Sequence, residues 1–585
     1  MLSASDQKLF DDVVTNAIDI LRLSAKQRAD VLRRLQKIEA EMVKRLSENN
    51  LGKFSRRDVE KFLASTGEMI DEAYGEIPDS LNLDQTGRVV SDASATSLEV
   101  ALGIDAVSLP KPDYFKSLAS EILIQGAPQV DWWRAQSEAL KHKFKVQVRQ
   151  GLANSETNEQ IISRIVGSKE QAGIMPIARR DAASLVQTSV QSVANDARRA
   201  TFQANRDVIK GLRQVSTLDS HTSIICVAYS GAEWDLDYKP INGNKLPFNS
   251  GTPRHFKCRS VETPITKTFA ELGLPGVPEP AISTRASSSG QIAQDASFNN
   301  YLIRMGPEFQ DEVLGKGRAQ LWRDGKLTLD QLVSGEGNPL SLSELQRKYG
   351  KDFKFEVFSD SQLKGLEKKV VQPYNTGDEL YKHAPEGQAQ FEELMGKVGK
   401  TLGLRTDLKP SELIGEALAS DDGFLFIGKL KAREGRATEK VMNDYKGHWE
   451  KLADIIRGTI SVKTPAELKK AIDTMLESGI KLAQLPKNKF AKPTLEHYRD
   501  VLTIVKLPNG MLAEVQFHLK GMTQAKDKAH KYYEVTRRLQ GKYDTEELPT
   551  PNWSKADAET FYRNFEPQLL EYNKAWRTVA EENGS

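Results

Sequence analysis

Cysteine and long apolar runs are both scarce in this chain. Cys226 and Cys258 are the two cysteines among its 585 residues, which excludes a disulfide scaffold and favours a reducing compartment. No stretch approaches the ~18 consecutive apolar residues of a membrane-spanning helix. The N-terminus also lacks the basic region and apolar run of a signal peptide, so we expect no membrane association.

A strong net charge is absent as well. The 82 Lys and Arg residues nearly balance the 80 Asp and Glu residues, which leaves a net charge of +2. Such a balance gives no global attraction to nucleic acid or to a membrane surface. Any basic binding site therefore has to be local.

The length indicates three or more domains, because 585 residues exceed what one hydrophobic core organises. Apolar positions at helical spacing predict helices over residues 1–75 and 112–170 and a long helix over 178–215. Short-strand and turn sequence follows at 216–237, and the Pro-, Ser- and Gly-rich stretch 274–297 predicts a flexible linker. The predicted parts are a helical N-terminal region (1–110), a second domain (111–273), the linker (274–297), a helical element with a junction (298–375) and a separate α+β unit (376–585).

Two short segments concentrate metal-ligand chemistry. "LDSHTSIIC" carries Asp219, His221 and Cys226, and "PRHFKCR" carries His255 and Cys258. Zinc takes soft or borderline ligands in a tetrahedron, and Cys226, His255 and Cys258 with either His221 or Asp219 would supply four. The same residues also fit a structural turn region in which Asp219 caps a turn and both cysteines are buried. Nucleophilic catalysis by cysteine needs an activated thiolate, and nothing in the sequence indicates one.

The order of these segments resembles that of a known family. The long helix, then "STLDSHTSIIC" and "GTPRHFKCRS", and further on "FQDEVLGKGRAQLWRDGKLTLDQLV" resemble the phage head morphogenesis domain of the Mu F-protein type, over roughly residues 110–350. That family usually ends its motif with Cys-Arg-Cys, whereas this chain has Ser260 at the last position. The resemblance implies a minor capsid protein in the phage head beside the portal. Its partners would be portal and head proteins, and it would be in the host cytoplasm during assembly or after ejection.

The C-terminal unit contains a hairpin with one polar face. Residues 497–518, "HYRDVLTIVKLPNGMLAEVQFH", predict two strands around a Pro-Asn-Gly turn. Side chains alternate along a strand. Glu514, Gln516 and His518 therefore share one face of the return strand, and the apolar residues between and after them share the other.

A strand at 453–462 and a helix at 465–477 precede this hairpin, and the order strand, helix, strand, strand predicts a small mixed sheet with packed helices. Asp454 begins the first strand, so it can share one Mg²⁺ with Glu514 if their strands are neighbours. The upstream run "GKLKAREGRATEK" adds cations that would bind a polyphosphate near such a metal, although alone it also fits a solvated, charged helix face. These cations are Lys429, Lys431, Arg433, Arg436 and Lys440.

This set of residues resembles the RelA/SpoT nucleotidyltransferase family, the synthetases of (p)ppGpp, over about residues 425–540. Asp454 in "ADIIRGTI" matches the Asp of the family's first core strand, and Tyr498 in "HYRDVL" matches its motif aromatic. Glu514 and Gln516 in "EVQFH" match its Glu-hydrophobic-Gln motif.

A later helix of the family is matched by His530 and Tyr533 in "AKDKAHKYYE". The chain also departs from the family pattern, and the departures leave the identity of the acceptor open. The departures are His518 for Arg, His497 for Gly, Asp500 for Ser and Leu502 for His.

The resemblance implies a pyrophosphokinase that uses ATP as its donor substrate. Asp454, Glu514 and Gln516 would be catalytic, and the two carboxylates would hold Mg²⁺. The implied nucleotide-binding residues are the five cations above with Tyr498, Arg499, His518, His530 and Tyr533.

The sequence therefore predicts a multidomain protein with three kinds of part: a largely α-helical N-terminal half, a small α+β Mu F-like part and a C-terminal α+β RelA/SpoT-like domain. Its predicted function is that of a minor head protein whose C-terminal domain transfers pyrophosphate to a nucleotide, as a toxin delivered with the head would. Two alternatives stay open. One is a purely structural capsid protein with an inactive C-terminal fold. The other is a toxin that pyrophosphorylates RNA, which would need a broad basic surface and bind with strong salt dependence.

Overall fold

The computed structural model describes residues 4–49, 51–104, 107–168, 172–268, 271, 284–287, 290–293, 297–350, 357–406, 423–443 and 445–582. They divide into two compact units: unit 1 is Met1–Ala319 with Thr328–Ser341, and unit 2 is Gln320–Leu327 with Leu342–Ser585. Each unit has its own hydrophobic core. The chain is thus multidomain, while the finer boundaries expected from the sequence stay predictions.

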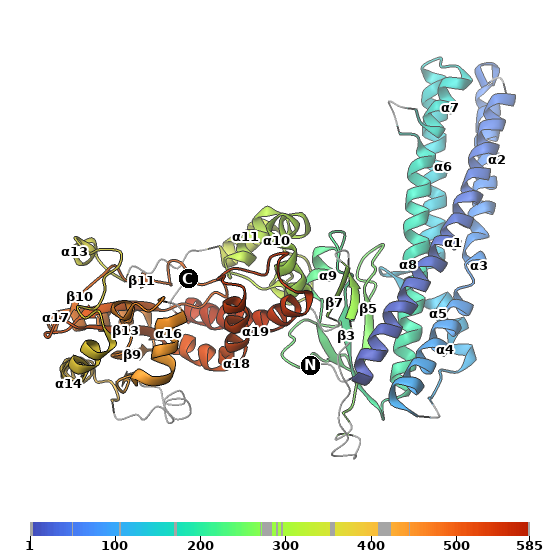
Figure 1. The fold of residues 1–585 in the computed structure, drawn as a ribbon. Helices are drawn as coiled ribbons and strands as arrows, with labels where there is room; N and C mark the ends of the chain where they lie inside the picture. The colour runs from blue at the N-terminus through green and yellow to red at the C-terminus, as the bar shows by residue number, and fades with distance from the viewer. Residues whose placement is uncertain are drawn as a thin grey trace. The chain divides into compact units, whose positions relative to one another are not determined.

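Unit 1 is built on long helices, as the periodicity of its sequence predicted (Figure 1). A capping box of Ser55 and Asp58 begins α2, since each side chain satisfies a backbone N–H of the other. Among the described residues, no helix has the length and apolar content needed to cross a membrane. The helices of this part are α1 (Ala4–Glu48), α2 (Arg56–Gly75), α3 (Ile77–Ser80), α4 (Leu83–Leu102), α5 (Pro112–Glu121), α6 (Gln129–Ala153), α7 (Asn158–Val166) and α8 (Ile174–Ala204).

Helix α8 ends earlier than the sequence predicted. The helix expected over 178–215 stops at Ala204, and Ile209–Val215 form strand β3 instead. The Asn205 side chain donates hydrogen bonds to the carbonyls of Thr201, at 2.7 Å, and Ser108, at 2.9 Å, and such side-chain bonds compete with helix propagation. The helix α9 (Ile224–Ala228) follows, and β3 is the central strand of an antiparallel sheet with β4 (Glu233–Asp235) and β5 (Val261–Thr266).

The predicted linker 274–297 is described only in part. Thr284–Ser287 and Gly290–Ala293 pair as the antiparallel hairpin β6–β7, and the rest of the segment up to residue 296 lies outside the described residues. The hairpin differs from the unstructured segment expected there. The pairing is formed by backbone hydrogen bonds, which the Pro-, Ser- and Gly-rich composition of the segment did not reveal. The helical elements predicted next are α10 (Phe298–Leu314), α11 (Lys316–Arg323) and η2 (Leu329–Leu332).

Unit 2 contains the predicted mixed sheet, whose strands run in the order β10, β12, β13, β9, β8, with β11 also pairing with β12. Strand β13 is parallel to β9, with Glu514 opposite Arg457, and antiparallel to β12. Because β9 begins at Arg457, Asp454 lies before this strand and does not begin it, as the sequence had suggested. The strands are β8 (Phe424–Ile427), β9 (Arg457–Val462), β10 (Lys481–Leu482), β11 (Lys487–Asn488), β12 (Val501–Lys506) and β13 (Leu512–Leu519).

The apolar face of β13 is buried, which confirms the predicted alternation. Val515, Phe517 and Leu519 are each 0% exposed. This face packs under α14 (Gly377–Leu402) and α17 (Pro465–Glu477). Phe391 of α14 lies against Gly458, the residue opposite Val515 in the register.

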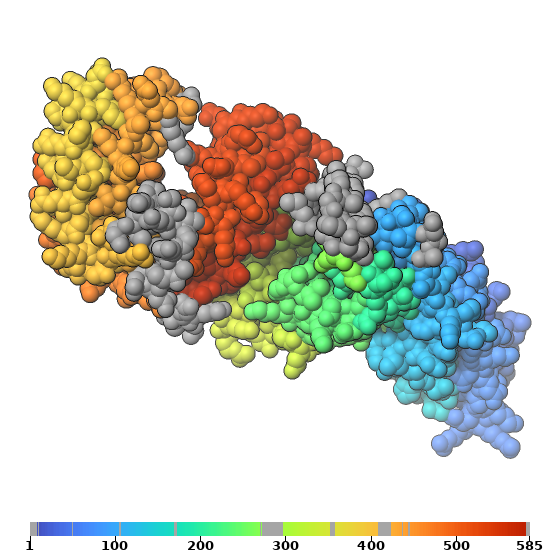
Figure 2. All heavy atoms as spheres, turned by 90° about the horizontal axis from the view of Figure 1, so that it is seen from below, coloured from blue at the N-terminus to red at the C-terminus, as the bar shows by residue number. Residues whose placement is uncertain are grey.

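The opposite face is covered at one end and open at the other. Helix α18 (Lys520–Lys542) lies over the far end, where Thr523 Oγ1 is 3.0 Å from Ser461 Oγ. It packs along α19 (Lys555–Glu582), and the two form one continuous red surface in Figure 2. Arg457, opposite Glu514 near the other end, is exposed. The Glu514 end of the polar face is therefore the accessible one.

Replacement of Val515 by Asp should destabilise unit 2, because it puts an unpaired carboxylate on the buried face. We expect a loss of roughly 3–5 kcal/mol and a fall in Tm on the order of 10 °C, measured by thermal melting. Lys506→Asp, at an exposed position of β12, is the matched control and should melt like the wild type. Equal melting of both variants would show that the Val515 side chain is not in the core.

Candidate active site

Asp454 lies between η4 (Trp449–Lys451) and β9 and is bound by two lysines. Its Oδ2 accepts hydrogen bonds from Lys431 Nζ at 2.6 Å and Lys440 Nζ at 3.0 Å. Its Oδ1 is buried and has no hydrogen-bond partner among the described residues. Burial alone would raise the pKa of Asp454, but the two ammonium groups outweigh burial and lower it. The carboxylate is therefore ionised at neutral pH, with one oxygen available to a further ligand.

Glu514 is placed near Asp454 by the parallel strand pairing. Its backbone N–H donates to the Ile456 carbonyl at 2.9 Å, and its Oε1 accepts from Gln516 Nε2 at 2.8 Å. Burial and then the negative charge of Asp454 raise the pKa of Glu514, while Lys440 and Lys431 partly offset them. The positive charges near the Glu514 carboxylate thus do not compensate for its burial and for the charge of Asp454.

These residues fit a divalent cation of the magnesium type. Mg²⁺ prefers hard oxygen ligands and usually takes one or two carboxylates together with substrate phosphates. Asp454 Oδ1 has no partner among the described residues, and the pKa of Glu514 is raised. A cation bound between the two carboxylates would supply the positive charge that both lack. Of the residues that the sequence proposed, the structure brings together Asp454, Glu514, Gln516, Lys431 and Lys440.

The polar face of β13 continues as a buried hydrogen-bonded chain. His518 Nε2 lies 3.2 Å from Gln516 Oε1, and His518 Nδ1 lies 3.3 Å from the Tyr498 hydroxyl. Tyr498 donates to Asp500 Oδ2 at 2.8 Å, and Lys489 pairs with Asp500 at 2.9 Å. The chain supports Gln516, which in turn orients Glu514.

His518, which was predicted to bind the nucleotide, is a buried residue. It is 1% exposed, and burial together with the charge of Lys526 lowers its pKa to about 3. It is therefore neutral and buried at neutral pH. The alternation of β13 predicted the face on which His518 lies, but could not show that α18 covers this end of it.

Arg499 and His530, which were also predicted to bind the nucleotide, have contacts elsewhere. Arg499 is 4% exposed, donates to the His497 carbonyl at 2.9 Å and lies 4.6 Å above the Trp576 ring. Burial lowers its pKa to about 10. His530 is exposed and pairs at 3.4 Å with Glu534 on its own helix. Their role toward a nucleotide stays a prediction.

The remaining predicted residues occupy mixed positions. Lys429 is exposed just after β8. Arg433, which begins η3 (Arg433–Ala437), pairs with Asp378 and lies 5.7 Å above the Trp449 ring. Tyr533 influences the pKa of Tyr498 and so lies near it. The Arg436 side chain lies outside the described residues.

Tyr381 and Lys526 are near the site and were missed in the sequence. Burial and the charge of Asp454 raise the pKa of Tyr381, on α14, to about 12. No local pattern links α14 to Asp454, so no sequence signal identified it. Lys526 lies 5.4 Å above the Tyr498 ring. It is one helical turn before His530, so the helical period of that segment could have found it.

His497 explains one departure from the resemblance. It has φ = 67°, a left-handed conformation that favours glycine, which is the residue the resembling family has there. Its ring is held by a 2.7 Å contact between Nδ1 and Asn573 Oδ1. The unusual backbone is thus retained without glycine.

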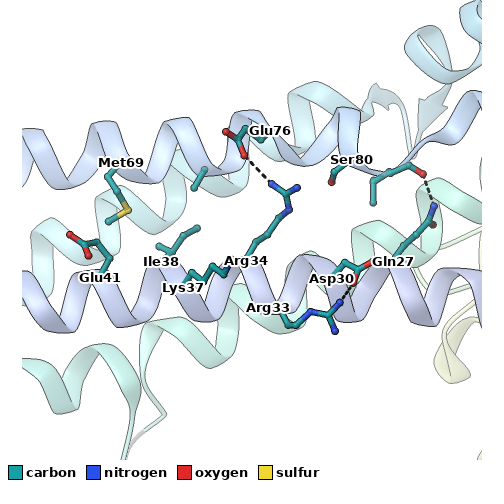
Figure 3. Close-up of a pocket in the computed structure, with 12 residues that line it drawn as sticks. Gln27, Asp30, Arg33, Arg34, Lys37, Ile38, Glu41, Met69, Glu76 and Ser80 are labelled. Carbon is teal, nitrogen blue, oxygen red and sulfur yellow. Dashed lines mark hydrogen bonds and ion pairs between the residues drawn. The ribbon is translucent and has the colours of Figure 1, made fainter.

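Unit 1 has a groove between α1 and the segment α2–α3, with a volume of about 670 Å³ (Figure 3). Its charges neutralise one another. Arg34 pairs with Glu76 at 3.0 Å, and Arg33 pairs with Asp30. No unpaired cluster of catalytic type lies there among the described residues, so it is not the candidate active site.

The predicted zinc ligands are brought together only in part. Cys226, His255 and Cys258 converge, with all three donor atoms within 4.8 Å of one another. Asp219 instead forms a two-bond ion pair with Arg259 at 2.6 and 2.7 Å. The predicted fourth ligand therefore does not come from Asp219, and His221, which is exposed, is not part of the group either.

No protein-family model matches this chain, and no curated protein matches it. Solved structures similar to part of it include the type VI effector Tas1 in a complex with its immunity protein, which is 21% identical over 32% of this chain and 98% of its own, with a TM-score of 0.19. Small alarmone synthetase 1 from Bacillus subtilis, bound to its product pppGpp, is 16% identical over 36% and 99%, with a TM-score of 0.22. A GTP pyrophosphokinase family protein from Streptococcus pneumoniae is 16% identical over 33% and 90%, with a TM-score of 0.21. Similarities this low carry no conclusion, so function has to be inferred from the side chains.

Glu514→Gln should stabilise unit 2 at high pH in the absence of metal. Because the pKa of Glu514 is raised on folding, its contribution to stability is full at low pH and is lost as the pH rises through the folded-state pKa. The variant removes this loss and keeps the bond from Gln516. We expect it to melt a few degrees above the wild type at about pH 8, with the difference shrinking toward about pH 4, near the usual pKa of glutamate.

The exposed Glu547 provides the control, since Glu547→Gln should leave Tm unchanged across this pH range. Melting of Glu514→Gln below the wild type at about pH 8 would contradict the repulsion between Glu514 and Asp454.

Proposed function

We propose that unit 2 is a Mg²⁺-dependent pyrophosphokinase of the RelA/SpoT type that uses ATP as donor and a nucleotide hydroxyl as acceptor. One observation carries the proposal. Asp454 and Glu514 share a site with two half-buried lysines, and Asp454 Oδ1 is left buried without a partner among the described residues. The bound ion would neutralise phosphate charge and polarise the phosphoryl oxygens. The residues of the chain would position both substrates.

The basic residues provide the charge that a triphosphate needs. Lys431 and Lys440 now bind Asp454 and would turn toward the phosphates once the carboxylate has a metal to bind. Arg433 and Lys429, both exposed, would extend this surface along the triphosphate. Charge-assisted hydrogen bonds of this kind are the strong ones in phosphate recognition.

The proposed reaction balances as a displacement at the β-phosphorus. The acceptor oxygen forms a bond to the β-phosphorus of ATP. The bond between the β-phosphorus and the α,β-bridging oxygen breaks, and AMP leaves with that oxygen. Glu514 would accept the proton of the attacking hydroxyl. Gln516 would hold Glu514 in place through its 2.8 Å hydrogen bond.

Glu514→Gln and Asp454→Asn should each lower pyrophosphate transfer at least ~100-fold, the usual loss for one electrostatic group of a catalytic site. The assay incubates the full-length chain with labelled ATP, Mg²⁺ and candidate acceptors and separates the products. EDTA should abolish transfer by the wild type. Glu547→Gln should remain as active as the wild type.

Full activity of Glu514→Gln would refute the catalytic role of Glu514. Absence of transfer by the wild type with every acceptor would refute the enzyme proposal and favour an inactive C-terminal fold. Labelling of RNA, and not of free nucleotides, would favour the RNA-modifying alternative instead. That outcome should be accompanied by strong salt dependence of binding.

Lys440→Met should raise KM for ATP about 10- to 100-fold, since a hydrogen bond to a charged group is worth ~1.5–3 kcal/mol. His530→Ala should leave KM unchanged, because His530 is exposed and pairs with Glu534 on its own helix. The motif resemblance assigned both Lys440 and His530 to nucleotide binding, whereas the structure places Lys440 at Asp454. The two variants therefore distinguish between these two predictions. An unchanged KM in Lys440→Met, or a raised KM in His530→Ala, would contradict the site described here.

We also propose that unit 1 acts as a phage minor head protein near the portal, present in the virion and in the host cytoplasm during assembly or after ejection. The support is the sequence resemblance. The two motif segments that carry it are joined by the ion pair between Asp219 and Arg259. Deletion of unit 1 should abolish incorporation of the protein into heads, measured by immunoblotting of purified particles, and normal incorporation would refute this role.

A further inference from the structure

The second chemistry-bearing cluster lies in unit 1 and does not rest on the function proposed for unit 2. Cys226 lies on α9, and His255 and Cys258 lie on the segment that leads into β5. Cys226 Sγ is 3.5 Å from Cys258 Sγ and 3.3 Å from His255 Nε2. Cys226 is 2% exposed and Cys258 is 0% exposed.

These separations are close to those of ligands around one zinc ion. With Zn–S of about 2.3 Å and Zn–N of about 2.0–2.1 Å, a tetrahedral site separates two sulfurs by roughly 3.8 Å and a sulfur from a nitrogen by roughly 3.5 Å. A disulfide needs its sulfurs at about 2.05 Å, much closer than they are here. The distances therefore fit shared coordination better than a covalent bridge.

The orientation of His255 fits a metal ligand as well. Its Nδ1 lies 2.8 Å from the Phe256 carbonyl oxygen, which can only accept, so Nδ1 carries the proton. The lone pair of Nε2 then points toward the two thiols and the Ser223 hydroxyl, 2.7 Å away. A histidine ligand to zinc is usually oriented in this way by a carbonyl on its other nitrogen.

The ligand segment is held on both sides. The Lys257 N–H donates to Thr188 Oγ1 of α8 at 3.0 Å. The ion pair with Asp219 neutralises Arg259, beside Cys258. That leaves two thiolates to balance the charge of one Zn²⁺.

We propose that Cys226, His255 and Cys258 bind one Zn²⁺ ion, with the fourth position facing the hydroxyls of Ser223 and Ser260. Ser260 is 2% exposed, and its hydroxyl donates to Ser216 Oγ at 3.3 Å. Ser216 in turn donates to the Cys226 carbonyl at 2.7 Å. Three protein ligands and one weak or water ligand make a site that cross-links α9 to the segment before β5. Zinc binding should therefore stabilise unit 1, as any ligand does that binds only the folded state.

The test uses the full-length chain freed of metal by a chelator and then titrated with ZnCl₂ or CoCl₂. We expect about one zinc per chain by elemental analysis, a higher Tm with zinc, and a thiolate-to-cobalt charge-transfer absorption with Co²⁺. His255→Ala and Cys258→Ser should each lower the zinc content and weaken that absorption. His221→Ala, which changes the nearby histidine outside the group, should retain both.

Variants of Ser260 provide a second test, which does not remove any of the three ligands. Ser260→Cys adds a third thiol, and with it a fourth protein ligand, and should bind zinc at least ~10-fold more tightly than Ser260→Ala, measured by competition with a chelator of known affinity. The absence of stoichiometric zinc together with a Tm unaffected by zinc would overturn the proposal. So would zinc retained by a Cys226→Ser, Cys258→Ser double variant, or loss of both free thiols to a disulfide.

Discussion

The parallel pairing of β9 with β13 is the constraint on which the candidate active site depends. It places Arg457 opposite Glu514, and the hydrogen bond from the Glu514 N–H to the Ile456 carbonyl continues the contact back toward Asp454. Two parallel strands need a crossover connection, and here the chain between them includes α17. Carboxylates from segments about 60 residues apart in the sequence therefore meet at the end of the polar face that stays open.

Asp219, which lies outside the proposed zinc site, and Asp454, which belongs to the candidate active site, show the difference between a structural and a functional carboxylate. Asp219 uses both oxygens in its ion pair with Arg259 and needs nothing more. Asp454 binds two lysines through one oxygen and leaves the other buried and unpartnered. An unpaired buried polar atom costs free energy, and such costs are concentrated where a ligand completes the site. The nearby Glu514, with its raised pKa, bears the same cost.

Three residues predicted to bind the nucleotide lie beside or on the last two helices. His518 is buried under α18, Arg499 lies above Trp576 of α19, and His530 is on the exposed surface of α18. A motif match places a residue on a strand or helix, but it says nothing about which later helix covers that face. Helix α18 does not cover the Glu514 end of the sheet, and five of the predicted site residues come together there.

The sequence by itself determined the elements and their faces, since alternation and capping are local. It predicted the strands of the hairpin, the helix over 465–477, the buried apolar face of β13 and the polar face with Glu514 and Gln516. Only the tertiary structure decided which of these polar residues meet. It brought Lys431 and Lys440 to Asp454, buried His518, and assembled Cys226, His255 and Cys258 without Asp219 or His221. These contacts join segments far apart in the sequence, and their geometry depends on strand order and helix packing, which no local pattern encodes.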